Sequence, residues 1–309
     1  MFEGGSSKGI QEVTVGASAA ADDVSTSGVA ADVGLTGETN GLKSHVHGTL
    51  HSRMSPSSIV QVMESITDNQ LKAIKDIGFG SMEYLKVTQL PLQLGLFLVH
   101  HFDAHTCSLK IPNSDPFPIT EEHVHQVLGL PIGGIEMDKN NFTRNSNVVK
   151  QWKKQFQSNS LSIKIGELKE FLKGHKSAGA MFKRNFVVLC VSTLMNGKQN
   201  VNINSDILTF LSDVDKIKDL NWSMYILDCL VKGKLFREQL PTRSFPGSLL
   251  FLMINLYLKK YELPVKFQSS KGGQQLCCQP VKNWKYLKEG LELFGEKRLM
   301  LVLQPWDWK

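Results

Sequence analysis

Histidines and a cysteine concentrate in one stretch of the sequence, where they could bind a metal ion. His101 and His105 are four residues apart, a spacing that places two side chains on one helix face, and zinc accepts imidazole and thiolate ligands. No C-x-x-C motif is present, and Asp103-Ala104 indicates that the helix ends before His105. We therefore favour surface, cap or core roles, and we predict no metal site. The residues of the cluster are His100, His101, His105, Cys107, His123 and His125.

The same stretch offers a second chemistry, which is nucleophilic catalysis by a thiolate. Such a site needs a cysteine beside an imidazole and a third group that orients the imidazole. Cys107 with His101 or His125, and Asp103 as the third group, would supply these types. Nothing in the spacing requires them to meet, so we predict no catalytic residue and do not expect an enzyme.

A band of basic residues suggests a different activity, which is contact with a polyanion. Between Arg144 and Arg184 the sequence holds ten bases and only two acids. Phosphate contacts need such charge on one face, although Trp152 and Phe156 have the spacing of inward side chains. A solvated helical face is the simpler interpretation, and nucleic-acid contact is the functional one. The candidate contact residues are Lys150, Lys153, Lys154, Lys164, Lys169, Lys173, Lys176, Lys183 and Arg184.

The elements that would position these residues are almost all helices, because apolar side chains recur at helical spacing. Thr120 and Asn221 fit N-caps, Gly78 and Gly129 fit helix ends, and only residues 107–111 suggest a strand. The sequence predicts a mainly α, irregular multi-helix globular domain with a disordered N-terminal tail and at most a short hairpin. The predicted helices begin at Ser55-Pro56 and continue near 68–77, 91–102, 120–128, 148–156, 165–174, 181–195, 206–211, 221–235 and 247–261.

Composition divides the chain into three parts. Residues 1–54 are rich in Gly, Ser, Ala and Thr, and their six acids against three bases give a net charge of −3. Such a segment cannot bury enough apolar surface to order itself, so we predict a disordered tail; we expect His45, His47 and His51 to be solvated there. Residues 55–261 would form the helical domain, and residues 262–309 a linker and partial C-terminal extension with a helix near 285–294.

The cysteines and the hydrophobic runs bear on the compartment. The number of cysteines, five, is odd, and no pattern of paired cysteines is visible, which indicates a reducing environment. No apolar run approaches the length of a membrane helix, and no secretory signal is visible. We expect a soluble protein of the nucleus or cytoplasm that is not secreted and binds no membrane.

Three sets of segments carry a family resemblance: 77–82 with 90–91 and 99–103; 118–131; and 182–186 with 213–218, 221–222 and 247–252. Together they resemble the helical region of plant transposon-derived proteins. The resemblance covers roughly residues 55–261, and the T-x-x-x-V-x-x-V-L-G-L-P pattern within 118–131 also resembles the plant mobile domain, sometimes labelled aminotransferase-like. It implies a non-catalytic interaction module that binds nucleic acid or an unknown protein partner.

The family resemblance also implies an alternative, because such proteins often carry a Ulp1-type SUMO or ubiquitin-like cysteine peptidase domain downstream. The chain would then be a truncated relative that lacks the catalytic domain. We find no peptidase domain with His, Asp and Cys in these 309 residues, so that activity is not carried over. No lysine is placed for a pyridoxal phosphate Schiff base either, and we predict no cofactor.

Overall fold

The described fold begins at Leu50 rather than at Ser55. The computed structural model describes residues 50–112, 114–138, 142, 145–156 and 162–260. Leu50 and Met54 are buried, which corrects the predicted boundary of the tail at residue 54. The predicted disorder of residues 1–49 and the predictions for residues 262–309, including the helix near 285–294, lie outside the described residues.

Helices dominate the described residues, so the prediction of a mainly α fold is confirmed. The α-helices are α1 (Ser57–Met63), α2 (Asp68–Asp76), α3 (Leu92–His101), α4 (Glu121–Leu128), α5 (Ser146–Lys154), α6 (Ile165–Gly174), α7 (Ala180–Cys190), α8 (Trp222–Gln239) and α9 (Leu249–Lys260). Short 3-10 helices lie at η1 (Gly80–Tyr84), η3 (Ser205–Phe210) and η4 (Ile217–Asp219), and η2 (Val191–Met195) is a π-helix.

Side-chain caps begin the helices that were predicted from their N-terminal residues. The Thr120 hydroxyl accepts a hydrogen bond from the His123 backbone N–H, and Gly129 ends α4 with a left-handed φ of 64°. The Asn221 side chain accepts from the Met224 backbone N–H at 3.0 Å and begins α8. Each cap satisfies a backbone donor that has no partner within its helix.

The predicted helix over 181–195 changes character part-way. It runs as α7 to Cys190 and then as the π-helix η2. In this buried segment the Ser192 hydroxyl donates to the Val188 carbonyl at 2.6 Å, and the Thr193 hydroxyl donates to the Leu189 carbonyl at 2.8 Å. Hydroxyls that bond backward to carbonyls compete with the backbone ladder, which gives a physical reason for the wider turn.

A small antiparallel sheet replaces the single strand predicted over 107–111. Its order is β1 (Phe102–Asp103), β2 (Ser108–Leu109) and β3 (Phe117–Pro118). Phe102 pairs with Leu109 across the first ladder, and Leu109 pairs with Phe117 across the second. The sheet follows the end of α3 and leads into α4.

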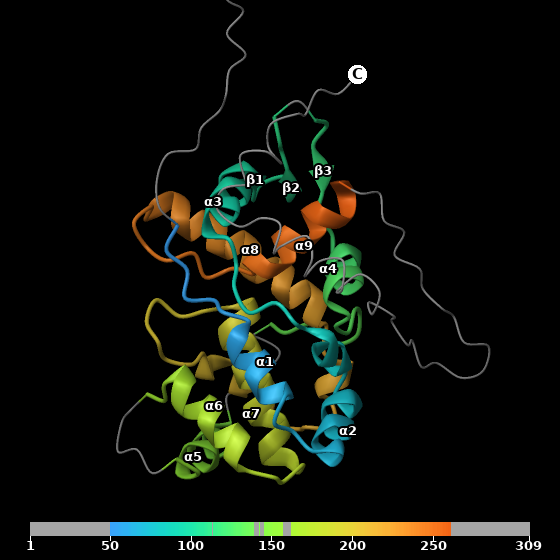
Figure 1. Cartoon of the computed structure of the whole chain (residues 1–309), viewed down its shortest axis with the longest axis vertical. Coiled ribbons are helices and arrows are strands. Elements are labelled where there is room, and N and C mark those ends of the chain that lie inside the picture. Colours follow the sequence, from blue (N-terminus) through green and yellow to red (C-terminus); the bar gives the residue numbers. More distant parts are fainter. Residues whose placement is uncertain (1–49, 113, 139–141, 143–144, 157–161, 261–309) are drawn as a thin grey trace, which may run out of the picture. The chain divides into compact units, whose positions relative to one another are not determined.

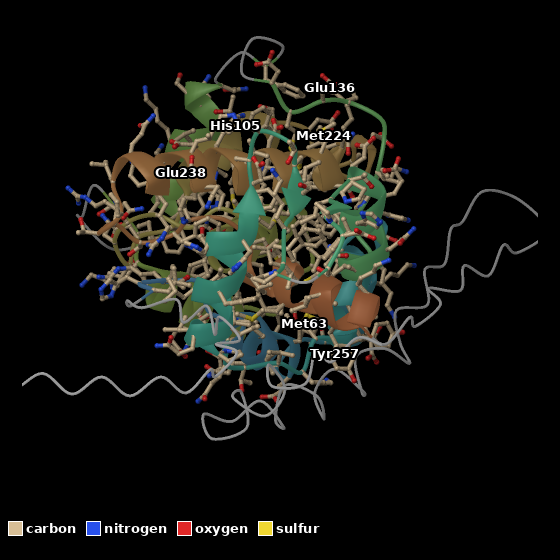
Figure 2. The ribbon with its side chains drawn as sticks, turned by 90° about the horizontal axis from the view of Figure 1, so that it is seen from above. Met63, His105, Glu136, Met224, Glu238 and Tyr257 are labelled. Atoms are coloured by element: carbon tan, nitrogen blue, oxygen red, sulfur yellow. The ribbon has the colours of Figure 1, made fainter. Side chains whose placement is uncertain are left out.

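The helices form two neighbouring groups around one hydrophobic core. Figure 1 shows α3, α4, α8 and α9 with the strands in one group and α1, α2, α5, α6 and α7 in the other. Phe79 and Trp222, both buried, meet edge to face with ring centroids 4.9 Å apart. Charged side chains such as Glu136 lie at the rim (Figure 2). Among the described residues, no helix has both the length and the hydrophobicity needed to cross a bilayer.

Candidate nucleic-acid interface

Helix α5 carries the most exposed part of the predicted basic band. Its N-cap is Asn145, whose side-chain oxygen accepts from the backbone N–H groups of Asn147 at 3.1 Å and Val148 at 3.3 Å. Lys150, Lys153 and Lys154 are all exposed. Lys150 and Lys154 are four residues apart and therefore share one helix face.

The opposite face of α5 is anchored by a buried indole. Trp152 is fully buried, and its Nε1–H donates to the Asn185 side-chain oxygen on α7 at 2.6 Å. Asn185 in turn donates to Gln155 at 2.7 Å. The Phe156 ring packs against Phe171 of α6 with centroids 5.0 Å apart. The prediction that Trp152 and Phe156 face inward is thus confirmed, and it leaves neither ring available for base stacking.

Lys164 extends the exposed positive charge to the start of α6. It is exposed and lies at an isolated antiparallel bridge with Asn202, where the Ile165 N–H donates to the Val201 carbonyl at 2.9 Å. The sequence contains no acid from residue 139 through residue 166. We call Lys150, Lys153, Lys154 and Lys164 the exposed lysine group.

The three lysines along and just after α6 have partners within the fold. Lys169 lies 3.2 Å from the Glu170 carboxylate and also donates to the Gln61 side chain at 3.0 Å. Lys173 lies 3.6 Å from the same carboxylate. Lys176 donates to the Ser65 carbonyl at 2.9 Å. These contacts tie α6 and the segment after it to α1 and the turn after α1.

The two bases on α7 are also engaged. Lys183 lies 4.0 Å from the Asp215 carboxylate. The Arg184 guanidinium donates to the carbonyls of Leu211 at 2.8 Å and Ser212 at 2.7 Å, and partial burial lowers its pKa. Five bases of the predicted band therefore have contacts within the fold, and four of them, Lys169, Lys176, Lys183 and Arg184, contact other segments of the chain.

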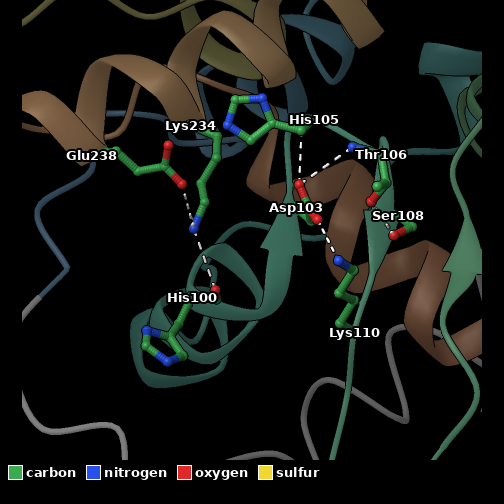
Figure 3. A network of polar contacts seen from close by, with 8 residues as sticks. All are labelled: His100, Asp103, His105, Thr106, Ser108, Lys110, Lys234 and Glu238. Atoms are coloured by element: carbon green, nitrogen blue, oxygen red, sulfur yellow. Dashed lines mark hydrogen bonds and ion pairs between the residues drawn. The ribbon is translucent and has the colours of Figure 1, made fainter.

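The first four residues of the His/Cys cluster, His100 to Cys107, lie at the end of α3 and in the turn between β1 and β2. Asp103 organises this turn (Figure 3). The Asp103 carboxylate accepts from the backbone N–H groups of His105 at 2.8 Å and Thr106 at 3.3 Å. Its ion pair with Lys110, followed by these hydrogen bonds, holds the Asp103 pKa well below its usual range. The carboxylate thus stabilises the turn instead of orienting an imidazole.

His101 and Cys107 of this cluster have surroundings typical of structural residues. The His101 Nδ1–H donates to the Phe97 carbonyl at 2.9 Å, and the imidazole of His100 points away from His105 in Figure 3. Burial, and then the Asp228 charge, raise the pKa of the Cys107 thiol, whereas a nucleophilic cysteine needs a lowered pKa. Cys107 instead adopts a φ of 46° in the turn before β2.

The two histidines of α4 belong to helix ends. His123 Nδ1 accepts from the Thr120 backbone N–H at 3.2 Å and completes a capping box. His125 Nδ1–H donates to the Leu130 carbonyl just after the helix. Across the described ranges, no three or more His, Cys, Asp or Glu side chains are grouped so that they could hold a metal ion.

Comparison with known families gives one match. Residues 52–253 match the family described as a domain of unknown function, DUF8566. The chain belongs to the DUF8566 family. No curated protein and no solved structure matches it. The resemblance of this DUF8566 chain to plant transposon-derived proteins, and the alternative of a truncated peptidase relative, stay predictions.

Two arginines of the DUF8566 domain, Arg53 and Arg243, were not among the residues predicted from the sequence to form a site. Arg53 was assigned to the predicted tail, and Arg243 lies in the loop between α8 and α9, yet both line one pocket with His51. No motif connects positions 190 residues apart in the sequence. The only available signal was that Leu50 and Met54 are apolar residues beside Arg53, which is typical of a chain entering its core.

Proposed function

We propose that the domain is a non-catalytic helical interaction module that binds nucleic acid through the exposed lysine group. The observation that carries this proposal is the arrangement of α5. Lys150 and Lys154 share its exposed face, and the buried Trp152 on the opposite face fixes its orientation. No acid between residues 139 and 166 offsets this charge.

The chemistry of the exposed face favours the nucleic-acid backbone over the bases. Lysine ammonium groups bind phosphates as point charges, and contacts to phosphates position a protein without reading sequence. The two aromatic side chains between Lys150 and Lys164, Trp152 and Phe156, are buried, so they cannot stack on unpaired bases. We therefore propose binding that depends on charge and has little sequence preference.

The state of the polar side chains near the sheet supports a non-catalytic role. Asp103, His123 and His125 are engaged in turns and caps. The pKa of Cys107 is raised by burial, so little of its nucleophilic thiolate form is present at neutral pH. These groups stabilise local structure, and the proposed binding face lies on other elements.

A pair of matched double variants tests the proposal. Lys150→Gln with Lys154→Gln removes two charges from α5, and Lys72→Gln with Lys86→Gln removes two from other exposed positions. The affinity of the full chain for a labelled 20-base-pair DNA duplex is measured by fluorescence anisotropy at low salt. We expect the α5 pair to weaken binding at least tenfold and the control pair to weaken it less than threefold.

Two results would contradict the proposal. Equal weakening by both pairs would mean that only the net charge matters and that α5 has no special role. Unchanged binding in the α5 pair would remove the exposed lysine group as the contact surface. All four lysines are exposed, so thermal unfolding of both double variants should match that of the parent chain, which confirms that any loss is a loss of contact.

A further inference from the structure

A polar pocket lies away from α5, where three segments distant in sequence meet beside the start of α3. Its volume is about 410 Å³, which falls within the range of roughly 300–1,000 Å³ typical of small-molecule sites. The segments are the chain before α1, the loop after η2, and the loop between α8 and α9. The described residues that line it are Leu50, His51, Ser52, Arg53, Leu92, Gln199, Thr242, Arg243 and Ser244, and none of them is acidic.

Hydrogen bonds between the backbones and one amide side chain hold the three segments together. The Phe245 N–H donates to the His51 carbonyl at 2.9 Å. The Gln199 side chain donates to the Ser244 carbonyl at 2.8 Å and accepts from the Ser244 N–H at 3.0 Å. The Gly197 N–H donates to the Pro246 carbonyl at 3.0 Å. These bonds hold the backbones of the lining segments beside one another, while the side chains of His51, Arg53, Thr242 and Arg243 remain exposed.

Hydrogen bonds hold the Arg53 side chain and the Arg243 backbone at the pocket. Arg53 Nε–H donates to the Gln199 carbonyl at 3.1 Å, which orients the guanidinium. Its two terminal amino groups can then donate to a ligand. Arg237 donates to the Arg243 carbonyl at 3.1 Å and so holds the backbone of Arg243. Among the described residues, neither Arg53 nor Arg243 forms an ion pair with a carboxylate.

We propose that this pocket binds the phosphate monoester group of a small organic ligand. A phosphate monoester carries a charge of roughly −1.5 to −2 at neutral pH, which matches the two guanidinium groups, whereas a carboxylate carries only half of that charge. Arginine presents donors in a planar fork that suits phosphate oxygens. The hydroxyls of Ser52 and Thr242 add further donors.

The pocket also has volume and one apolar side chain, Leu92, for the organic group that carries the phosphate. Leu92, at the start of α3, lines it and remains 41% exposed. An inorganic phosphate would leave most of the volume unfilled, so an organic group beside the phosphate should add affinity by covering this leucine. This site shares no residue with the exposed lysine group, and its ligand does not depend on nucleic-acid binding.

Isothermal titration calorimetry of the full chain tests the phosphate site directly. The probes are adenosine 5′-monophosphate, adenosine, inorganic phosphate and a short phosphoserine peptide. We expect the monophosphate to bind more tightly than inorganic phosphate and adenosine to show no binding. Arg243→Gln should weaken binding of the monophosphate at least tenfold, since its side chain is exposed and only its backbone takes part in the frame. Arg53→Lys should weaken binding as well, because lysine keeps the charge but loses the fork.

The Lys150→Gln, Lys154→Gln pair serves as the control and should bind the monophosphate like the parent chain. This separates the two proposals, because loss of DNA binding with intact monophosphate binding would leave the pocket site standing. Equal binding of adenosine and its monophosphate would overturn the phosphate site, as would unchanged affinity in Arg243→Gln. Failure of both adenosine 5′-monophosphate and inorganic phosphate to bind at millimolar concentration would also overturn it. Tighter binding of the phosphoserine peptide than of the monophosphate would overturn it too, because it would indicate a protein partner.

Discussion

The Nε1–H of Trp152 donates to the side-chain oxygen of Asn185 at 2.6 Å inside the core. This bond joins α5, which carries the exposed lysine group, to α7 at the centre of the fold. Asn185 also accepts from the Gln155 amide at 3.0 Å and donates to its oxygen at 2.7 Å. A single buried asparagine therefore supplies hydrogen bonds to both Trp152 and Gln155 of the α5 segment.

Replacing this asparagine should destabilise the domain. Asn185→Ala removes the partner of a buried indole N–H, and we expect the free energy of unfolding to fall by about 3 kcal/mol, because an unsatisfied buried donor and a small cavity both cost stability. Urea unfolding measures the change. Gln151→Ala, on the exposed side of α5, is the control and should change stability by less than about 0.5 kcal/mol. A loss below about 1 kcal/mol in Asn185→Ala would show that the anchor has little energetic weight.

Stability should decline below neutral pH because His123 is held neutral. Burial, with the charge of Lys259, lowers the His123 pKa below its ordinary value, against the opposing effect of Glu122. The unfolded chain then binds the proton first, so this contribution is fully present above about pH 6.5 and is lost as pH falls through the window below it. Burial also lowers the His101 pKa, with the same sign.

The His123→Gln variant isolates this effect. Glutamine at the third helical position can accept the Thr120 N–H in a capping box as His123 does, but it does not titrate. We expect the thermal midpoint of the variant to equal that of the parent chain at pH 7.5 and to decrease less between pH 7 and pH 5. A parallel decrease in both proteins would mean that His123 contributes nothing to the pH dependence.

The two cysteines in the helical core should resist alkylation in the native state. Burial raises the pKa of Cys229 to about 12 and raises that of Cys190 well above its usual value. The thiolate is the reactive form, so iodoacetamide at pH 8 should leave both unmodified for hours and should label both quickly in urea. Peptide mass spectrometry resolves each site. Rapid native labelling of Cys190 would mean that this part of the core opens far more often than its packing indicates.

Alanine variants at two adjacent glycines can distinguish the cost of backbone strain from the cost of a steric clash. Gly133 and Gly134 have φ of 71° and 79°. A Cβ at Gly133 would meet open space, but one at Gly134 would clash with the Asp219 carbonyl oxygen. Gly133→Ala should cost about 1 kcal/mol for its left-handed backbone, and Gly134→Ala should cost at least about 2 kcal/mol more. Equal unfolding free energies in the two variants would show that the loop yields to the clash.

The sequence predicted local features better than long-range ones. The Thr120 and Asn221 caps follow from interactions within three residues, and the burial of Trp152 follows from helical spacing. The π-helix η2 depends on how Ser192 and Thr193 pack once buried, and no apolar period reveals this. The meeting of Arg53 with Arg243 depends on tertiary structure alone.

The candidate site was predicted as a continuous basic band, because sequence shows charge but does not show partners. Lys176 and Arg184 are engaged by backbone carbonyls of the α1–α2 turn and of the segment after η3. Acceptors of this kind occur in every residue, so composition does not identify them. Only the tertiary fold separates these two bases from the exposed Lys150.

The dependence of DNA affinity on salt is the most direct test of the central claim, which is that the exposed lysine group binds phosphates. The dissociation constant of the full chain for the 20-base-pair duplex is measured from 25 to 200 mM NaCl. Each phosphate contact contributes a slope of about −0.9 in a plot of log K against log salt. We predict a slope between about −2 and −4 for the parent chain, reduced in magnitude by about 2 in the Lys150→Gln, Lys154→Gln variant. No binding at 25 mM NaCl, or a slope that the variant leaves unchanged, would contradict the account.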